Sequence, residues 1–159
     1  MEKETGIVEF ERGELKRYLW QYNDCKKRKQ QLEERLKDIE YEMKCPIGGN
    51  GYSPTPHSKT NKIGTGAAGF TLKMAEIEER IINQKVEMQR AMIEVMDVMN
   101  FLDESDTDRR ILEYRYLDGK DWKTIENLES MTRQAANNHL NAGLDKLLDF
   151  AKIRMLIGL

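Results

Sequence analysis

Apolar residues recur in steps of three and four along two long stretches of this chain, which is the spacing of one helical face. The first stretch predicts a helix from Glu14 to Lys44, preceded by polar, frayed residues 1–12. The second predicts a helix from about Leu72 to Leu102, with a stripe that methionines widen. Stripes this broad predict an antiparallel hairpin or a coiled coil. The stripe positions are Leu15, Tyr18, Tyr22, Cys25, Lys29 (the one interruption), Leu32, Leu36, Ile39 and Met43, then Met74, Ile77, Ile81, Met88, Met92, Val95, Met96, Val98, Met99 and Leu102.

Residues 45–71 separate these stretches and carry no periodic apolar pattern. They hold all three prolines and six of the eleven glycines of the chain. Such a composition predicts a flexible loop or linker. Two interpretations are open: a mobile connection between helices, or a loop that binds a partner or caps a substrate.

Three short helical patterns follow between Thr107 and Leu148. An Asp-Gly pair at residues 118–119 separates the first from the second, and residues 129–132 separate the second from the third. Thr132 is the predicted N-cap of the third helix, because its hydroxyl can accept a hydrogen bond from a free first-turn N–H. The apolar tail after Leu148 is expected to extend that helix and to pack back onto the domain or onto a second subunit. The apolar positions are Ile111, Leu112 and Tyr116, then Trp122, Ile125 and Leu128, then Ala136, Leu140, Gly143, Leu144 and Leu147.

Two helices joined by a tight turn are typical of the helix-turn-helix, whose second helix enters the DNA major groove. The string ILEYRYLDGKDWKTI, the following T-R-Q-x-x-x-N-x-L helix and the ending L-D-K-L resemble the fourth region of sigma-70-family factors. They are more similar still to ArpU- and RinA-type transcriptional regulators of Gram-positive prophages. The detailed match covers about a quarter of the chain, and the order of its helical segments also agrees. The resemblance implies an activator of late or packaging genes that binds double-stranded DNA and contacts RNA polymerase.

The polar side of the third predicted helix carries the candidate chemistry. Asn and Gln can bond adenine N6 and N7 bidentately, and Arg can bond guanine O6 and N7. Lys120 and Lys123 flank the start of the preceding helix, which commonly meets the phosphate backbone. The alternative is a polar face that meets only solvent. The candidate DNA-binding residues are Lys120, Lys123, Thr132, Arg133, Gln134, Asn137, Asn138 and Asn141.

Four further residues near this face need an interpretation. Arg109 and Arg110 are candidate supporting cations, whereas Arg115 is expected to be an internal partner for an acid. His139 lies at the edge of the apolar face of the third helix. It is expected to be packed and hydrogen-bonded, with a contact to a DNA phosphate as the alternative.

Composition narrows the function classes. The 159 residues carry a net charge of −2, so any DNA affinity must come from the local arrangement of charge. The chain lacks G-x-x-x-x-G-K-[ST], G-x-S-x-G and H-E-x-x-H, and its two cysteines form no metal-binding pattern. An enzyme, a metal site and a cofactor are therefore not expected. No secretory signal and no apolar stretch long enough to span a membrane are visible, which favours a cytoplasmic protein.

The sequence thus predicts an all-α protein. Residues 1–102 are expected to form the helical oligomerisation region, with the loop at 45–71, and residues 103–159 a tri-helical helix-turn-helix domain. The favoured function is sequence-specific transcription regulation of phage type by a homo-oligomer. Two rivals stay open: a DNA-packaging subunit of small-terminase type, and a protein-interaction module whose helix-turn-helix no longer binds DNA.

Overall fold

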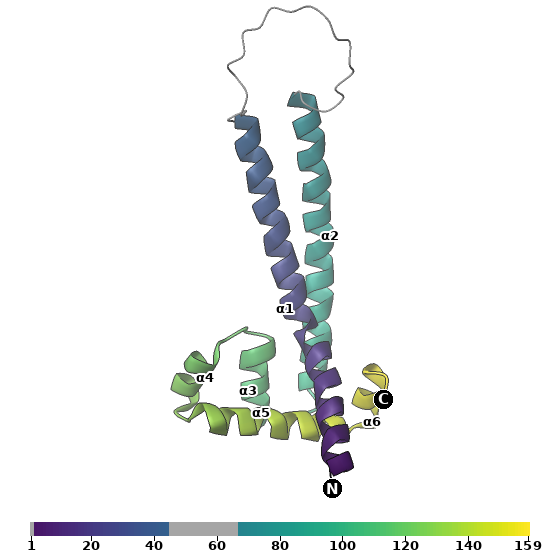
Figure 1. The fold of residues 1–159 in the computed structure, drawn as a ribbon, viewed down its shortest axis with the longest axis vertical. Coiled ribbons are helices and arrows are strands. Elements are labelled where there is room, and N and C mark those ends of the chain that lie inside the picture. Colours follow the sequence, from purple (N-terminus) through teal and green to yellow (C-terminus); the bar gives the residue numbers. More distant parts are fainter. Residues whose placement is uncertain (1, 45–66) are drawn as a thin grey trace, which may run out of the picture. The chain divides into compact units, whose positions relative to one another are not determined.

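The computed structural model describes residues 2–44 and 67–159, and every regular element in these ranges is an α-helix. The prediction of an all-α fold is therefore confirmed. No helix in the described ranges is long and apolar enough to cross a membrane. The helices are α1 (Glu2–Lys44), α2 (Ala67–Met99), α3 (Thr107–Tyr116), α4 (Trp122–Glu129), α5 (Arg133–Leu148) and α6 (Ala151–Leu156), as labelled in Figure 1.

Two predicted helix starts were wrong. Helix α1 begins at Glu2 rather than Glu14, so the segment expected to fray is helical. Ion pairs hold this segment, since Glu11 pairs with Arg154 at 2.6 Å and Arg12 pairs with Asp145 at 2.5 Å. Helix α2 begins at Ala67, within the expected loop, and the rest of that loop, 45–66, lies outside the described residues.

The tail after Leu148 also differs from the prediction. It does not extend α5 but forms a separate short helix, α6. Ile153 of α6 is fully buried, so the tail packs back onto the chain as expected. The chain turns at Asp149 and Phe150, and the Phe150 ring meets Phe101 edge-on with centroids 5.1 Å apart. This aromatic contact supports the turn that separates the two helices.

The chain divides into two compact units, each built from parts of both long helices. One comprises Met1–Lys26 and Glu87–Leu159, and the other comprises Lys27–Val86. In the second unit, the pKa of Glu33 on α1 is lowered by its hydrogen bond to Lys29, and the charge of Lys85 on α2 adds to this effect. The candidate site lies entirely in the first unit.

The core of the first unit joins the N-terminal part of α1 and the C-terminal part of α2 to the helices that follow them. Leu19 belongs to this core although it lies outside the predicted stripe, because it follows the buried Leu15 by one helical turn. Three predicted apolar positions are exposed instead: Met43 at 44%, Met96 at 46% and Leu128 at 51%. The buried core residues are Leu15, Leu19, Val95, Val98, Met99, Leu102, Ile111, Leu112, Tyr116, Ile125, Ala136, Leu140, Leu144, Leu147, Leu148 and Ile153.

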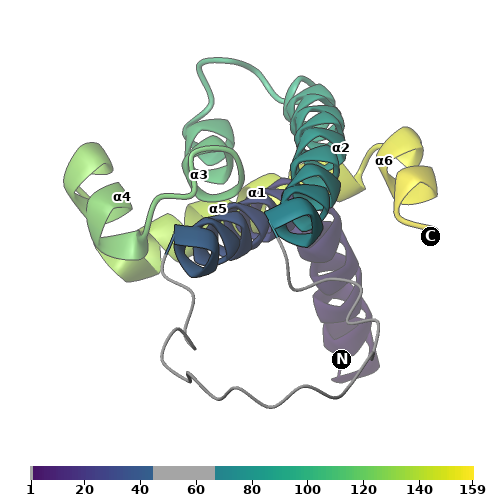
Figure 2. The same ribbon diagram turned by 90° about the horizontal axis from the view of Figure 1, so that it is seen from above.

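Side-chain caps fix where α3, α4 and α5 begin. Asp106 accepts from the backbone N–H of Asp108, Asp121 from Thr124, and Thr132 from Ala135. The predicted N-cap at Thr132 is therefore confirmed. Ser130 ends α4 in the left-handed conformation, at φ 51° and ψ 42°, so only residues 130–132 separate α4 from α5. In Figures 1 and 2, α3 crosses α5, and α4 lies at the N-terminal end of α5.

Candidate nucleic-acid interface

Helix α5 has one buried and one exposed face over its first turns. The predicted apolar stripe is confirmed, since Ala136, Leu140, Gly143, Leu144 and Leu147 are all buried. On the other side, the polar residues of the first two turns are exposed to solvent. These are Arg133, Gln134, Asn137 and Asn138.

The exposed amides have no hydrogen-bond partner within the described part of the chain. Among the hydrogen bonds of the described residues, none involves the side chain of Gln134, Asn137 or Asn138. The Thr132 hydroxyl accepts from Ala135 N at 3.2 Å and is exposed, so its own proton can be donated outward. The first two turns of α5 therefore present donors and acceptors that a ligand can use.

Asn141 does not belong to this exposed face, contrary to the prediction. It is half-buried, and its Oδ1 is fully buried with no hydrogen-bond partner among the described residues. It lines a pocket of about 290 Å³ together with residues of α1, among them Arg12, Gly13 and Lys16. Because α1 covers this part of α5, the exposed polar surface ends at Asn138.

A ladder of alternating aromatic rings and guanidinium groups connects α1 to α5. The Arg115 guanidinium lies 5.2 Å from the ring centroid of Trp20 and 5.3 Å from that of Trp122. Arg133 continues the ladder, 5.9 Å from the Trp122 centroid. These distances fall in the range of cation–π attraction. The four residues come from α1, α3, α4 and α5, so the ladder fixes the start of α5 against three other helices.

Arg115 is thus not the partner of an acid, which the sequence had predicted. One of its terminal nitrogens donates to the Lys120 carbonyl at 3.2 Å, and the ion pairs of the described residues do not include it. The indoles of Trp20 and Trp122 take the place of a carboxylate. The participation of Trp20 was missed, because nothing local in the sequence relates α1 to residues almost a hundred positions later.

The two candidate lysines of the interface differ in their surroundings. Lys120 Nζ lies 4.3 Å from the Tyr114 ring centroid and 3.4 Å from a carboxylate oxygen of Asp118, so it is partly neutralised. Lys123 is exposed on the first turn of α4, and no ion pair of the described residues involves it. Lys123 is therefore the freer of these two cations.

Arg109 and Arg110, the expected supporting cations, are engaged within the protein. Arg109 pairs with Glu113 at 2.7 Å and donates to the Leu102 carbonyl at 2.8 Å. Arg110 binds both carboxylate oxygens of Glu129 at 3.0 Å, which links α3 to α4. The hydrogen bond from Arg110 lowers the pKa of Glu129. These guanidinium groups stabilise the fold rather than offering charge to a ligand.

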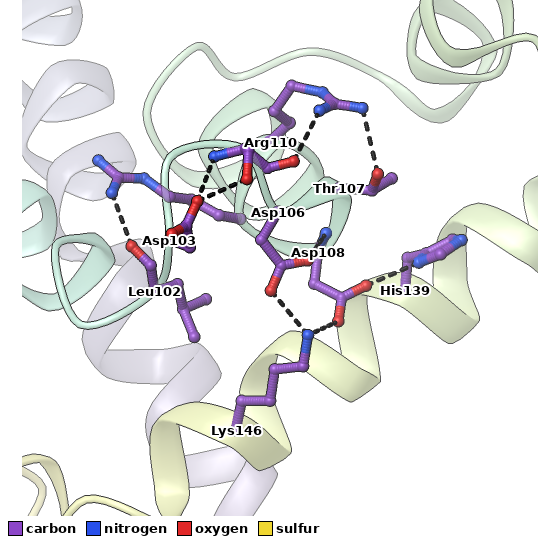
Figure 3. Close-up of polar contacts among 10 residues, drawn as sticks. Leu102, Asp103, Asp106, Thr107, Asp108, Arg110, His139 and Lys146 are labelled. Atoms are coloured by element: carbon purple, nitrogen blue, oxygen red, sulfur yellow. Dashed lines mark hydrogen bonds and ion pairs between the residues drawn. The ribbon is translucent and has the colours of Figure 1, made fainter.

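A buried carboxylate joins α3 to α5 (Figure 3). Asp108 is 6% exposed, and it binds His139 Nδ1 at 2.6 Å and Lys146 Nζ at 2.7 Å. Lys146 also reaches Asp106 at 2.7 Å, and that hydrogen bond lowers the pKa of Asp106. His139 is hydrogen-bonded and only partly exposed, as predicted. The cluster satisfies a buried charge with two partners, which a buried carboxylate requires.

Comparison with known proteins adds no family. No family model, curated protein or solved structure matches the chain. No group of three or more potential ligands in the described ranges could hold a metal ion. The exposed face of α5 and its surroundings are therefore the features that bear on function.

Proposed function

We propose that this protein is a sequence-specific DNA-binding transcription regulator, in which α4 and α5 form a helix-turn-helix and α5 is the recognition helix. One observation carries the proposal. The exposed first two turns of α5 present Arg133, Gln134, Asn137 and Asn138, while the opposite face of the helix is buried. In helix-turn-helix proteins the N-terminal residues of the recognition helix contact base edges.

The chemistry of these side chains suits the major groove. An Asn or Gln amide matches the N6 and N7 atoms of adenine, and Arg matches O6 and N7 of guanine. Asn disfavours helix interiors, so helix propensity does not account for two adjacent Asn residues here. Their amides are also uncommitted, so binding DNA would break no hydrogen bond within the described chain.

Phosphate contacts would complete the interface. Lys123 lies on the first turn of α4, and the Thr132 hydroxyl lies at the N-cap of α5. Lys120 contributes less, because Asp118 neutralises part of its charge. Few free cations imply modest affinity per subunit, so self-association or contact with RNA polymerase would have to supplement it. Regulation of phage late genes is what the sequence resemblance adds to this proposal.

The proposal is tested by selecting bound duplexes from a random DNA library with the full-length protein. We expect an enriched motif. Replacing Asn137 or Asn138 with Ala should relax one or two positions of that motif, by roughly 1–3 kcal/mol each. Helix content and thermal unfolding should not change, because an exposed Asn-to-Ala change does not weaken a helix.

Leu144→Ala is the matched control on the other face of α5. Leu144 is fully buried, so its truncation should cost about 2–5 kcal/mol of stability. The motif selected by the remaining folded protein should stay the same. If the library yields no motif with the wild-type protein, or if the Asn variants select the same motif, α5 is not a recognition helix.

A second candidate is a protein-interaction module. The observation that favours it is the pairing of the C-terminal cations with acids: Arg109 with Glu113, Arg110 with Glu129, and Lys146 with Asp106 and Asp108. Such pairing leaves little positive field for DNA. Failure of the selection together with an unperturbed fold would favour this candidate.

The small-terminase type of assembly is distinguished by its mass in light scattering, because a large ring is expected for it.

A further inference from the structure

We infer that the pocket lined by Lys16, Arg17, Trp20 and Arg115 binds a phosphate of the DNA backbone beside the base pairs that α5 reads. This inference rests on the proposed function and extends the interface from the C-terminal helices to α1. The pocket lies within the first compact unit and has a volume of about 330 Å³. Asp24 and Tyr116 complete its lining.

The charge of the pocket favours an anion. Three cations line it against one carboxylate, that of Asp24. Outside the lining, Glu14 pairs with Arg17 at 3.0 Å, but the Arg17 side chain is 78% exposed and such pairs exchange readily for another anion. No ion pair of the described residues involves Lys16. This sets the pocket apart from the rest of the unit, where most cations near α5 are already neutralised.

Arg115 gives the pocket a prepared donor. Its guanidinium is held between two indole faces and by one hydrogen bond to the Lys120 carbonyl. A guanidinium has five N–H groups, so most of them stay available. An oriented guanidinium loses little side-chain entropy on binding phosphate and can bind two of its oxygens at once. The Trp20 ring, which meets the buried Tyr116 edge-on, makes a rigid wall that a deoxyribose can contact.

The ladder places the pocket close to the recognition helix. Trp20 and Arg115 are pocket residues, and the next two members of the ladder are Trp122 and Arg133. Each step between successive members is shorter than 6 Å. Phosphates follow one another every few ångströms along a strand, so a duplex seated on α5 has backbone within reach of the pocket.

The test measures the salt dependence of DNA binding by the full-length protein. The probes are the selected duplex and a random-sequence duplex, titrated by fluorescence anisotropy at several salt concentrations. Lys16→Gln with Arg17→Gln should weaken binding to both duplexes alike. The slope of log affinity against log salt concentration should become shallower by about one to two. Each lost phosphate contact reduces the slope by about one, so this change corresponds to one or two lost contacts. The affinity ratio between 50 and 200 mM salt should therefore fall by roughly four- to sixteenfold.

Lys152→Gln on α6 is the matched control, because this exposed lysine lies outside the pocket, with its ammonium 5.9 Å from the Phe101 ring centroid. It should leave the slope unchanged. Arg115 is left in place, since it packs between two indoles and its loss would perturb the fold. Circular dichroism checks that the variants keep their helix content.

The outcomes separate this inference from the proposed function. A wild-type protein that binds neither duplex overturns both. A wild-type protein that selects a motif, with a double variant of unchanged slope, overturns the phosphate site alone. Binding of adenosine monophosphate that the double variant abolishes, with no change in the DNA slope, also overturns it and assigns the pocket to a free nucleotide. A shallower slope with an unchanged motif supports it.

Discussion

Gly143 is a residue at which α5 packs closely against α3. A Cβ at this position would lie 2.7 Å from Leu112 Cδ1 and 3.2 Å from Asp108 Cβ. Leu112 is fully buried and Asp108 is held by two partners, so neither can move away freely. The small residue is needed here to bring two helices together, not to give the backbone freedom.

Gly143→Ala is therefore expected to destabilise the protein by about 1–3 kcal/mol, the usual cost of forcing an extra carbon into a packed core. Urea unfolding followed by circular dichroism measures this difference. Gly13→Ala is the control, because Gly13 is exposed on α1 and a Cβ there would meet no atom within 4 Å. That change should stabilise α1 by roughly 0.5–1 kcal/mol. Equal effects of the two changes would rule out close packing as the role of Gly143.

At the scale of elements, the turn between α4 and α5 depends on one strained residue. Ser130 has φ 51°, a conformation that costs an L-residue roughly 1–2 kcal/mol. Its backbone N–H still bonds the Glu126 carbonyl and so ends α4. A glycine would adopt the same conformation without that cost.

Ser130→Gly should thus raise stability by about 0.5–1 kcal/mol, part of the gain being lost to the greater freedom of glycine in the unfolded chain. Thermal unfolding measures the gain. Ser130→Ala keeps a Cβ and should bring none. Because Ser130 is exposed and lies outside the polar face of α5, the DNA motif should not change in either variant. A stabilising Ala variant would mean that strain is not what limits the turn.

The elements near this turn could be predicted because their signals are local. Asp121 and Thr132 cap the helices that follow them. Gly119, with φ 64°, lies in the turn between α3 and α4. The start of α1 could not be predicted in this way. The ion pairs that Glu11 and Arg12 make reach residues more than a hundred positions away, so no local signal in the sequence indicates them.

The candidate site divides along the same line. Helical periodicity was enough to separate the exposed Arg133, Gln134, Asn137 and Asn138 from the apolar stripe. Periodicity also placed Asn141 on the exposed side. The pattern of a single helix does not show that α1 packs over this part of α5. The partners of Arg115 were missed for the same reason, since Trp20 reaches it only through tertiary packing.

At the scale of the whole molecule, apolar side chains remain exposed on α2. Ile82 is 60% and Val86 is 51% exposed, whereas the neighbouring Ile81 is buried within the chain. Ile82 and Val86 lie four residues apart and therefore share one face of the helix. Repeated apolar exposure on one face suits association with a second copy of the chain.

Self-association should then depend on Ile82 and Val86. Ile82→Glu with Val86→Glu is expected to lower the mass measured by light scattering while helix content is kept. Ile81→Glu should instead unfold this part of the chain, since it buries a charge without a partner. A wild-type protein that is monomeric at tens of micromolar would contradict the idea of an oligomer.

The ion pairs between the two ends of the chain also determine when the protein can fold during its synthesis. Arg12 and Asp145 are 133 positions apart, and Glu11 and Arg154 are 143 apart. A ribosome delivers Leu15 and Leu19 early, long before the helices that bury them. The apolar side chains of the amino-terminal segment therefore stay exposed until α5 and α6 have been synthesised. The entropy of closing so long a loop must be lost before these contacts can stabilise the fold. The nascent chain is for that interval the form most exposed to aggregation and to chaperone capture.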